Sequence, residues 1–224
     1  MTNTHLHQVN RPIFSVIMPT FNRANTVTAA IQSLQAQKLT SWELIAINDG
    51  STDETHQVVS KMAESDARIR LLTQKNQGAA LARNFGISEA RGEFLAFLDS
   101  DDTLTPNHLE LRLNAFSEMN IDLIYGPANI IGNPMVIDTN NPTRMISLND
   151  ESVKICGTFA IRTAQALRIG GFPNLKYSED GEFFTKALRF GLKAFRLGMK
   201  TYNYDRTSPD SISTQLLQLI TKVC

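Results

Sequence analysis

Apolar runs of strand length alternate with helical patterns along the first half of the chain. The runs that predict strands are Ile13 to Met18, Glu43 to Asn48, Ile69 to Leu72, Glu93 to Leu98 and Asp122 to Tyr125. Between them, apolar residues recur at helical spacing and predict helices near 27–34, 51–62, 78–90 and 106–119. Strand and helix in alternation predict an α/β fold with a mostly parallel central sheet and helices on both faces.

One helix carries a start signal. The second predicted strand ends in Asp49-Gly50, and Ser51 is followed three residues later by Glu54. This is the spacing of a capping box, in which the hydroxyl and the carboxylate each accept a backbone N–H of the first turn. We therefore expect Ser51 to cap the helix that carries Val59.

The pattern loosens after Tyr125. Gly, Pro and Asn are frequent through 126–150, and helical spacing returns only near Thr163 and from Glu179 to Phe190. No Ser/Gly linker, repeat or low-complexity tract divides the chain. We predict a flexible tail at 1–11 and one domain at 12–224, with an irregular α+β half at 126–224 after the half at 12–125.

Composition excludes several classes of protein. The chain has 224 residues, 42% of them hydrophobic, which is enough for a sizeable core. Lys plus Arg and Asp plus Glu both total 22, so there is no positive excess for a long nucleic acid. Two cysteines make neither a disulfide framework nor a four-cysteine zinc site. With no signal peptide or membrane span visible, we expect a cytoplasmic protein. The amphipathic stretch 212–220 leaves core packing, partner packing and peripheral membrane association open.

Polar residues follow each predicted strand of the first half. They are Pro19 to Arg23, Asp49, Gln74 to Gly78, and Asp99 to Asp102. Ligands of parallel sheets bind beyond the carboxyl ends of the strands, so these residues should share one rim. The carboxylates of Asp49, Asp99, Asp101 and Asp102 would repel one another there unless hydrogen-bonded or neutralised. Mg²⁺ or Mn²⁺ prefers such oxygens and also binds phosphate.

Each candidate also has a structural interpretation. Asp99 to Asp102 could shape a turn and cap the next helix, and Asp49 could make an Asp-Gly turn. Arg83 could pair with Glu89 or another surface acid. The pair Glu179-Asp180 stands near a predicted helix start, where either acid could act as the N-cap.

The order of these pieces resembles the inverting, nucleotide-sugar-dependent glycosyltransferases of family 2, which have the GT-A fold. The matching segments are Val16 to Arg23, Ile47 to Asp53, Asn76-Gln77-Gly78 with Ala82-Arg83-Asn84, Phe97 to Asp102, Gly170 to Pro173 with Ser178 to Glu182, and Tyr204 to Ser213. The resemblance covers about Phe14 to Ser213, nearly the whole chain.

The resemblance implies a role for each position. Nucleotide-sugar binding falls to Pro19, Thr20, Asn22, Arg23, Asp49, Asn76, Gly78, Arg83, Asp99 and Ser100. Asp49 would accept an N–H from uracil or another base, and Arg83 would lie along the diphosphate. Asp101 would ligate Mn²⁺ or Mg²⁺. Asp180 would be the general base, with Glu179 beside it in the catalytic pair.

The implied reaction moves a sugar from a nucleoside-diphosphate sugar, with UDP as the expected nucleotide, to an acceptor hydroxyl. One base and in-line attack imply inversion of the anomeric carbon. The acceptor would be a saccharide, or a lipid-linked or protein-linked sugar. Many family members carry a histidine in the closing motif; here there is none, which leaves water, Thr207 or Ser208 to take its place.

Two other functions remain open at this point. A catalytically silent sugar-nucleotide-binding module would fit the missing histidine. Asp99 to Thr103 also fits the Asp-x-Asp-x-Thr motif of haloacid dehalogenase-like phosphatases, although that motif normally follows the first strand and here follows the fourth.

Overall fold

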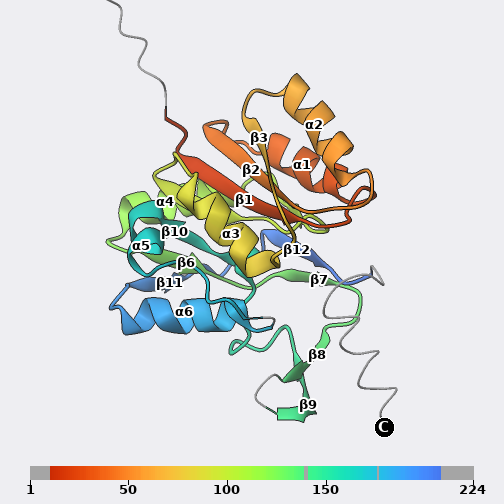
Figure 1. Cartoon of the computed structure of the whole chain (residues 1–224). Helices are drawn as coiled ribbons and strands as arrows, with labels where there is room; N and C mark the ends of the chain where they lie inside the picture. The colour runs from red at the N-terminus through yellow and green to blue at the C-terminus, as the bar shows by residue number, and fades with distance from the viewer. Residues whose placement is uncertain (1–10, 139–140, 176, 208–224) are drawn as a thin grey trace, which may run out of the picture.

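The structure, a computed structural model, describes residues 11–138, 141–175 and 177–207. Within these ranges seven strands form a central sheet in the order β11-β6-β10-β4-β1-β2-β3 (Figure 1). Their bounds are β1 Phe14–Thr20, β2 Trp42–Asp49, β3 Ile69–Gln74, β4 Phe94–Phe97, β6 Leu123–Tyr125, β10 Ala160–Arg162 and β11 Ala194–Arg196. The predicted tail, but for Arg11, and the predicted amphipathic stretch lie outside the described residues.

The sheet is mostly parallel, as predicted. Strands β3, β2, β1 and β4 are parallel to one another, and β11 is parallel to β6. The exception is β10, which runs antiparallel between β4 and β6. Because β10 comes from the second half of the chain, both halves contribute to one sheet.

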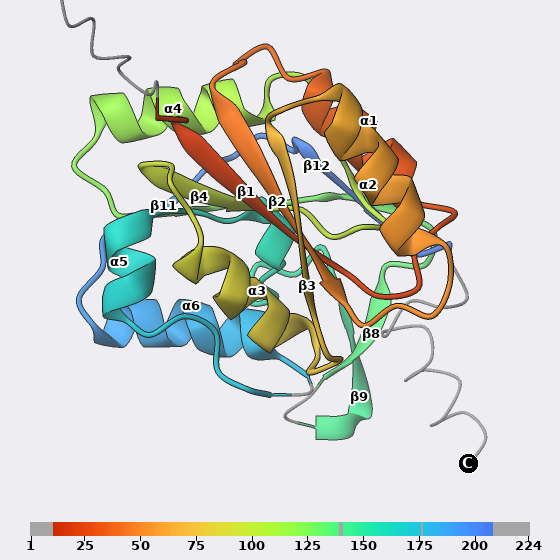
Figure 2. The same cartoon turned by 45° about the horizontal axis from the view of Figure 1, so that its top comes forward.

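Helices cover both faces of this sheet (Figure 2). Their bounds are α1 Val27–Gln35, α2 Thr55–Ser65, α3 Ala79–Ser88, α4 His108–Glu118, α5 Thr163–Arg168 and α6 Glu179–Arg189, with a short 3₁₀ helix η1 at Cys156–Thr158. Alternate residues of the strands point to opposite faces. Val16 and Met18 of β1 join the core cluster with α1, α2 and α4, whereas Ile17 joins the cluster with α3, α5 and α6. Every residue of β2 is buried, as expected for a strand covered on both faces.

Two small sheets complete the described fold. One has the order β5-β12-β7, with β5 at Thr103–Leu104, β12 at Tyr202–Asp205 and β7 at Asn129–Ile131. The other pairs β8 at Met135–Asp138 with β9 at Asn141–Ser147. In the first of these sheets, β12 lies beside the segment that follows β4, and it thereby joins the end of the described chain to the rim of the central sheet.

The predicted capping box at Ser51 is wrong. Helix α2 begins at Thr55 with Glu54 at the N-cap position, and none of its N-terminal N–H groups donates to Ser51. The Asp53 carboxylate accepts the backbone N–H of Thr55 at 2.9 Å, and the Ser51 hydroxyl accepts the backbone N–H of Asn22 at 3.1 Å. Asp53 also accepts the backbone N–H of Ala24 at 3.1 Å, so both residues bind the loop after β1 and only Asp53 also binds the start of α2.

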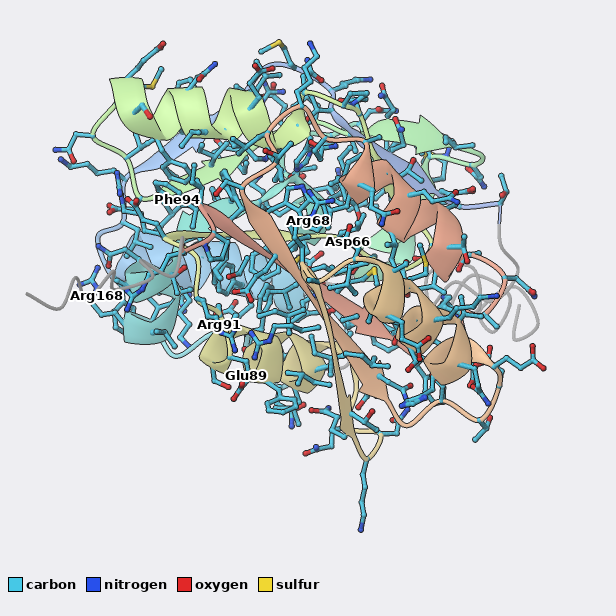
Figure 3. The ribbon with its side chains drawn as sticks, turned by 90° about the horizontal axis from the view of Figure 1, so that it is seen from above. Asp66, Arg68, Glu89, Arg91, Phe94 and Arg168 are labelled. Carbon is cyan, nitrogen blue, oxygen red and sulfur yellow. The ribbon has the colours of Figure 1, made fainter. Side chains whose placement is uncertain are left out.

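Charged side chains stabilise the edge of the sheet where the parallel strands begin. The Ser15 hydroxyl donates to Glu43 at 2.7 Å and accepts the backbone N–H of Gly92 at 2.8 Å, and Glu43 also accepts the N–H of Arg91 at 2.8 Å. Figure 3 shows Arg91 at this edge, where α3 has ended and β4 is about to begin. These hydrogen bonds hold the α3–β4 turn against the N-terminal ends of β1 and β2, away from the C-terminal strand ends that form the rim.

Candidate active site

The loops that follow the parallel strands meet at one rim, as the sequence predicted. The Asn22 backbone N–H reaches Ser51, and the Asn22 side-chain oxygen accepts the N–H of Thr52 at 2.9 Å, which joins the loops after β1 and β2. Asn22 has a φ of 53°, the left-handed region that Asn tolerates better than most residues. Arg23 then reaches Asp101 of the loop after β4, with Nε 3.4 Å from Oδ2.

Asp49 organises the loop after β3. Its Oδ1 accepts hydrogen bonds from the Gln74 side chain at 2.7 Å and from the backbone N–H of Gln77 at 2.9 Å, and its Oδ2 accepts the N–H of Gly78 at 2.8 Å. Gly78 has a φ of +90°, which a side chain would disfavour. The Asp49 carboxylate thus holds the loop after β3, whereas in its own Asp-Gly turn it is the Asn48 side chain that accepts the backbone N–H of Ser51, at 3.1 Å. The contact of Asp49 with a nucleotide base stays a prediction.

We expect Asp49→Ala to lower the free energy of unfolding by about 1–3 kcal/mol, because it leaves the N–H groups of Gln77 and Gly78 without their acceptor. Urea denaturation measures the loss, and calorimetry with UDP measures the accompanying loss of nucleotide affinity. Asp49→Asn is the matched variant, since it keeps one acceptor oxygen. An unchanged free energy of unfolding in Asp49→Ala would contradict the role of Asp49 in holding the loop after β3.

The other predicted nucleotide-binding residues divide by exposure. Asn76 and Gly78 are exposed on the rim, and Pro19 is partly buried at the end of β1. Thr20 and Ser100 are buried, and the Thr20 hydroxyl donates to the backbone carbonyl of Ile47 at 3.1 Å. Thr20 therefore joins β1 to β2, and the contact of the exposed Asn76 and Gly78 with a ligand stays a prediction.

Arg83 of α3 gathers three carboxylates from distant parts of the chain. Its guanidinium donates to Asp99 at 2.7 Å and to Glu179 at 3.0 Å, and it lies 3.8 Å from Asp180. Only 5% of the Arg83 side chain is exposed. Glu89, the partner considered for a surface pair, binds Arg70 instead. Arg83 thus brings the end of β4 and the start of α6 together at one centre.

Asp180 is held with one oxygen free of hydrogen bonds. Its Oδ2 accepts the backbone N–H of Cys156 at 2.9 Å, whereas its buried Oδ1 has no hydrogen-bond partner. Burial raises the pKa of Asp180 to about 7; Arg83 opposes that rise, and the charges of Glu179 and Asp99 add to it. The Oδ1 lies 3.8 Å from Nη1 of Arg83, beyond hydrogen-bond distance. A carboxylate with an oxygen that makes no hydrogen bond and a pKa near neutrality suits a general base.

Helix capping does not account for the Glu179-Asp180 pair. The N-cap position of α6 is Ser178, and Glu179 and Asp180 are the first two helical residues. The helix N-terminus favours acidic residues there in general, but the specific contacts are with Arg83 and with Cys156. Both acids therefore face the carboxylate centre.

Asp99 and Asp101 supply carboxylate oxygens of the kind that Mn²⁺ or Mg²⁺ prefers. The pKa of Asp101 is raised by burial and, to a smaller extent, by the negative charge of Asp99, whereas the charge of Arg23 lowers it. The Asp99 charge is therefore close enough to act on Asp101. No group of three His, Cys, Asp or Glu side chains that could hold a metal occurs in 11–138, 141–175 or 177–207. These two carboxylates alone would supply only part of a cation's ligands, so metal binding by Asp101 stays a prediction.

The remaining acid of this cluster has a structural role. Asp102 is 1% exposed, and it accepts hydrogen bonds from the Tyr202 hydroxyl at 2.5 Å and from the backbone N–H of Asp205 at 2.7 Å. Thr207, considered as a replacement for the missing histidine, donates its hydroxyl to Asp205 at 2.6 Å, and Ser208 lies outside the described residues. Sequence reasoning missed Tyr202 and the N–H of Cys156, because neither belongs to a recognisable motif.

A family model described as glycosyl transferase family 2 matches residues 15–169. The chain belongs to this family. The match includes the strand ends around Asp49 and Asp99, and it decides against the phosphatase interpretation of Asp99 to Thr103. The α6 residues Glu179 and Asp180 lie beyond the matched range.

Curated relatives of this family 2 chain are named as glycosyltransferases. An uncharacterized glycosyltransferase of Haemophilus influenzae is 30% identical over 212 residues, covering 92% of this chain and 84% of the relative. The UDP-Glc:alpha-D-GlcNAc-diphosphoundecaprenol beta-1,3-glucosyltransferase WfgD of Escherichia coli is 38% identical over 146 residues. That alignment covers 65% of this chain and 56% of WfgD, so it leaves much of WfgD unmatched.

Solved structures confirm the predicted GT-A fold. The S. aureus TarS fragment 1–349 in complex with UDP-GlcNAc has a TM-score of 0.74 at 25% identity, covering 93% of this chain and 65% of that chain. The mannosyltransferase PcManGT of Pyrobaculum calidifontis, in complex with GDP-Man and Mn²⁺, has a TM-score of 0.70 at 18% identity, covering 91% of this chain and 59% of that chain. This second likeness bears on the fold alone.

Proposed function

We propose that this family 2 chain transfers a sugar from a nucleoside-diphosphate sugar, with UDP as the nucleotide, to an acceptor hydroxyl with inversion. The observation that carries the proposal is the carboxylate centre around Arg83, with the Oδ1 of Asp180 free of hydrogen bonds. Two similar proteins support UDP as the nucleotide: WfgD, which by its name uses UDP-Glc, and TarS, whose structure holds UDP-GlcNAc.

Asp180 acts as the general base. The acceptor hydroxyl donates to the free Oδ1 and gives up its proton as the new glycosidic bond forms, a contribution of about 10²- to 10⁴-fold. The N–H of Cys156 fixes the other oxygen, so the carboxylate keeps its orientation. A single base on the side opposite the leaving group makes one displacement, which inverts the anomeric carbon.

The donor lies across the rim of strand ends. Asn76 and Gly78 are exposed there, and the turn that carries them is held by Asp49. Asp99 would contact the ribose of the nucleotide. The Arg83 guanidinium donates to one oxygen of Asp99 at 2.7 Å and fixes the orientation of this carboxylate. Asp49 would contact the base from the same turn. The predicted contact of Arg83 with the diphosphate would require its guanidinium, which is 5% exposed and bound to Asp99 and Glu179, to turn toward the rim.

Asp101, with Asp99 beside it, would hold Mn²⁺ or Mg²⁺ together with the donor diphosphate. The bound ion supplies Lewis-acid stabilisation of the charge that develops on the leaving nucleoside diphosphate. Arg23 lies 3.4 Å from Asp101 and limits how far this carboxylate can turn. Two carboxylates are too few for tight metal binding alone, which predicts that the ion and the nucleotide bind together.

The acceptor is proposed to be a saccharide or a lipid-linked or protein-linked sugar. WfgD, by its name, acts on a sugar carried by diphosphoundecaprenol. Across the described part of the chain, no helix is both long enough and apolar enough to span a membrane.

A screen of nucleotide sugars tests the proposal. Thermal stabilisation by one donor that depends on Mn²⁺ should identify the nucleotide and the sugar together. Release of nucleoside diphosphate in the presence of candidate acceptors then measures transfer, with Asp180→Asn as the inactive control. Binding without release for every acceptor would favour a silent sugar-nucleotide-binding module.

The turnover number should fall as the pH drops below about 7. The raised pKa of Asp180 means that its basic, ionised form is lost through protonation near pH 7 rather than near pH 4. For one ionisation at that pKa, kcat at pH 6 is about a tenth of its plateau value. Initial rates at saturating donor, acceptor and Mn²⁺ measure this profile. A flat profile down to pH 5 would contradict the role of Asp180.

A further inference from the structure

Tyr202, at the start of β12, packs against η1, whose backbone binds the carboxylate of the proposed base Asp180. The side chain is fully buried. A Cβ built on Gly157 would overlap the Tyr202 ring, so only glycine allows this approach of η1 to β12. The preceding residue in η1 is Cys156, whose N–H binds the Asp180 carboxylate. The ring of Tyr202 is therefore one residue away from the group that orients the base.

The hydroxyl of Tyr202 fixes the loop on the donor side. It accepts the backbone N–H of Asp99 at 3.2 Å and donates to Asp102 at 2.5 Å. Asp102 also accepts the N–H of Asp205, which lies on the same strand as Tyr202. Both ends of the turn that carries Asp101 are thus fastened to β12.

A second buried side chain joins the same two elements. Arg112 of α4 donates to the Thr158 carbonyl of η1 at 2.8 Å and to the Thr201 hydroxyl, just before β12, at 3.0 Å. Arg112 is 1% exposed. Because Arg112 binds both elements, these bonds hold η1 and β12 in a fixed relative position. A displacement of β12 would therefore also move η1.

We propose that Tyr202 is a positioning residue that sets the distance between the Asp99–Asp102 turn and the base Asp180. The inference rests on the proposed function, because that function assigns the Asp99–Asp102 turn to the donor and metal and Asp180 to the acceptor. In-line displacement requires the reacting atoms about 3–3.5 Å apart, and a misplacement of about 1 Å can cost 10²-fold in rate. The Tyr202 side chain contacts both the Asp99–Asp102 turn and η1, which binds Asp180, so it can set this distance.

Tyr202→Phe tests the proposal by keeping the ring against Gly157 and removing only the hydroxyl. We expect kcat to fall by about 10- to 100-fold. We also expect the affinity for UDP in the presence of Mn²⁺ to fall about tenfold, since the N–H of Asp99 and the Asp102 carboxylate lose their partner. Calorimetry without any sugar measures this second effect, with GDP run in parallel with UDP.

Ser15→Ala is the matched control. It also removes a buried hydroxyl that makes several hydrogen bonds, but at the opposite edge of the sheet. We expect it to lower the melting temperature and to leave nucleotide affinity and kcat at the wild-type values. A general loss of stability would affect both variants alike, whereas positioning affects only Tyr202→Phe.

Asp102→Asn extends the test if Tyr202→Phe does not fold. It should reproduce part of the loss of affinity. In a folded double variant the combined loss should be smaller than the sum of the two single losses, because both substitutions weaken the contact between Tyr202 and Asp102. Wild-type nucleotide affinity and kcat in Tyr202→Phe, or in Asp102→Asn where only that variant folds, would overturn the positioning role alone. If the wild-type chain bound neither UDP nor GDP with Mn²⁺, both this inference and the proposed function would fail.

Discussion

Asp180→Asn should lower kcat by about 10²- to 10⁴-fold and leave Mn²⁺-dependent nucleotide binding intact. Asparagine has nearly the shape of aspartate, and its side-chain oxygen can still accept the N–H of Cys156. What it lacks is the basic oxygen that takes the acceptor proton. Release of nucleoside diphosphate with the true acceptor measures the rate, and calorimetry measures binding.

Glu179→Gln separates the base from its neighbour. Glu179 accepts a hydrogen bond from Arg83 at 3.0 Å, so the amide keeps an acceptor for the guanidinium but loses the charge. We expect a smaller effect, mainly on acceptor affinity and local packing. Near-normal transfer by Asp180→Asn, or a larger loss of kcat in Glu179→Gln, would move the base assignment away from Asp180.

Most of the elements predicted from sequence were long enough to show a period or a continuous apolar run, although β6, with three residues, was predicted as well. β2 has eight buried residues in succession, and α1 places Val27, Ile31 and Leu34 on one face. By contrast β10 and β11 have three residues each, too few to distinguish alternation from a loop. β10 also runs antiparallel, and its pairing with β4 depends on contacts far along the chain.

The candidate site was predictable where it follows strand ends and unpredictable where it depends on tertiary contacts. Asp49 is the last residue of β2 and Asp99 lies two residues beyond β4, and their position at one rim follows from the parallel order of the strands. The acids around Arg83 come from 16 and 96 residues away, and no local pattern announces that they meet. Tyr202 is similar, because its partner Asp102 is 100 residues away.

Asp101→Asn should abolish the dependence of nucleotide binding on Mn²⁺. In the wild-type chain we expect UDP to bind at least tenfold more tightly with Mn²⁺ than with excess chelator, because Asp99 and Asp101 hold only part of the coordination shell and the diphosphate completes it. Asparagine supplies one neutral oxygen in place of the carboxylate. It also removes a buried charge and its repulsion with Asp99, which together raise the pKa of Asp101 in the native chain while Arg23 lowers it. Apo stability should therefore change little or rise, while the gain from the metal disappears.

Asp66→Asn is the control for this comparison. Asp66 binds Arg68 at 2.8 Å beside the start of β3, as Figure 3 shows, at the edge away from the strand ends. Its pKa is held below the usual range, chiefly by the hydrogen bond from Arg68, so the substitution removes a charge that stabilises the fold. We expect it to lower stability and to preserve the difference in UDP affinity between Mn²⁺ and chelator. Equal UDP affinity in the two conditions for the wild-type chain would show that Asp101 holds no metal, and the loss of that difference in Asp66→Asn would show that the effect is not local to Asp101.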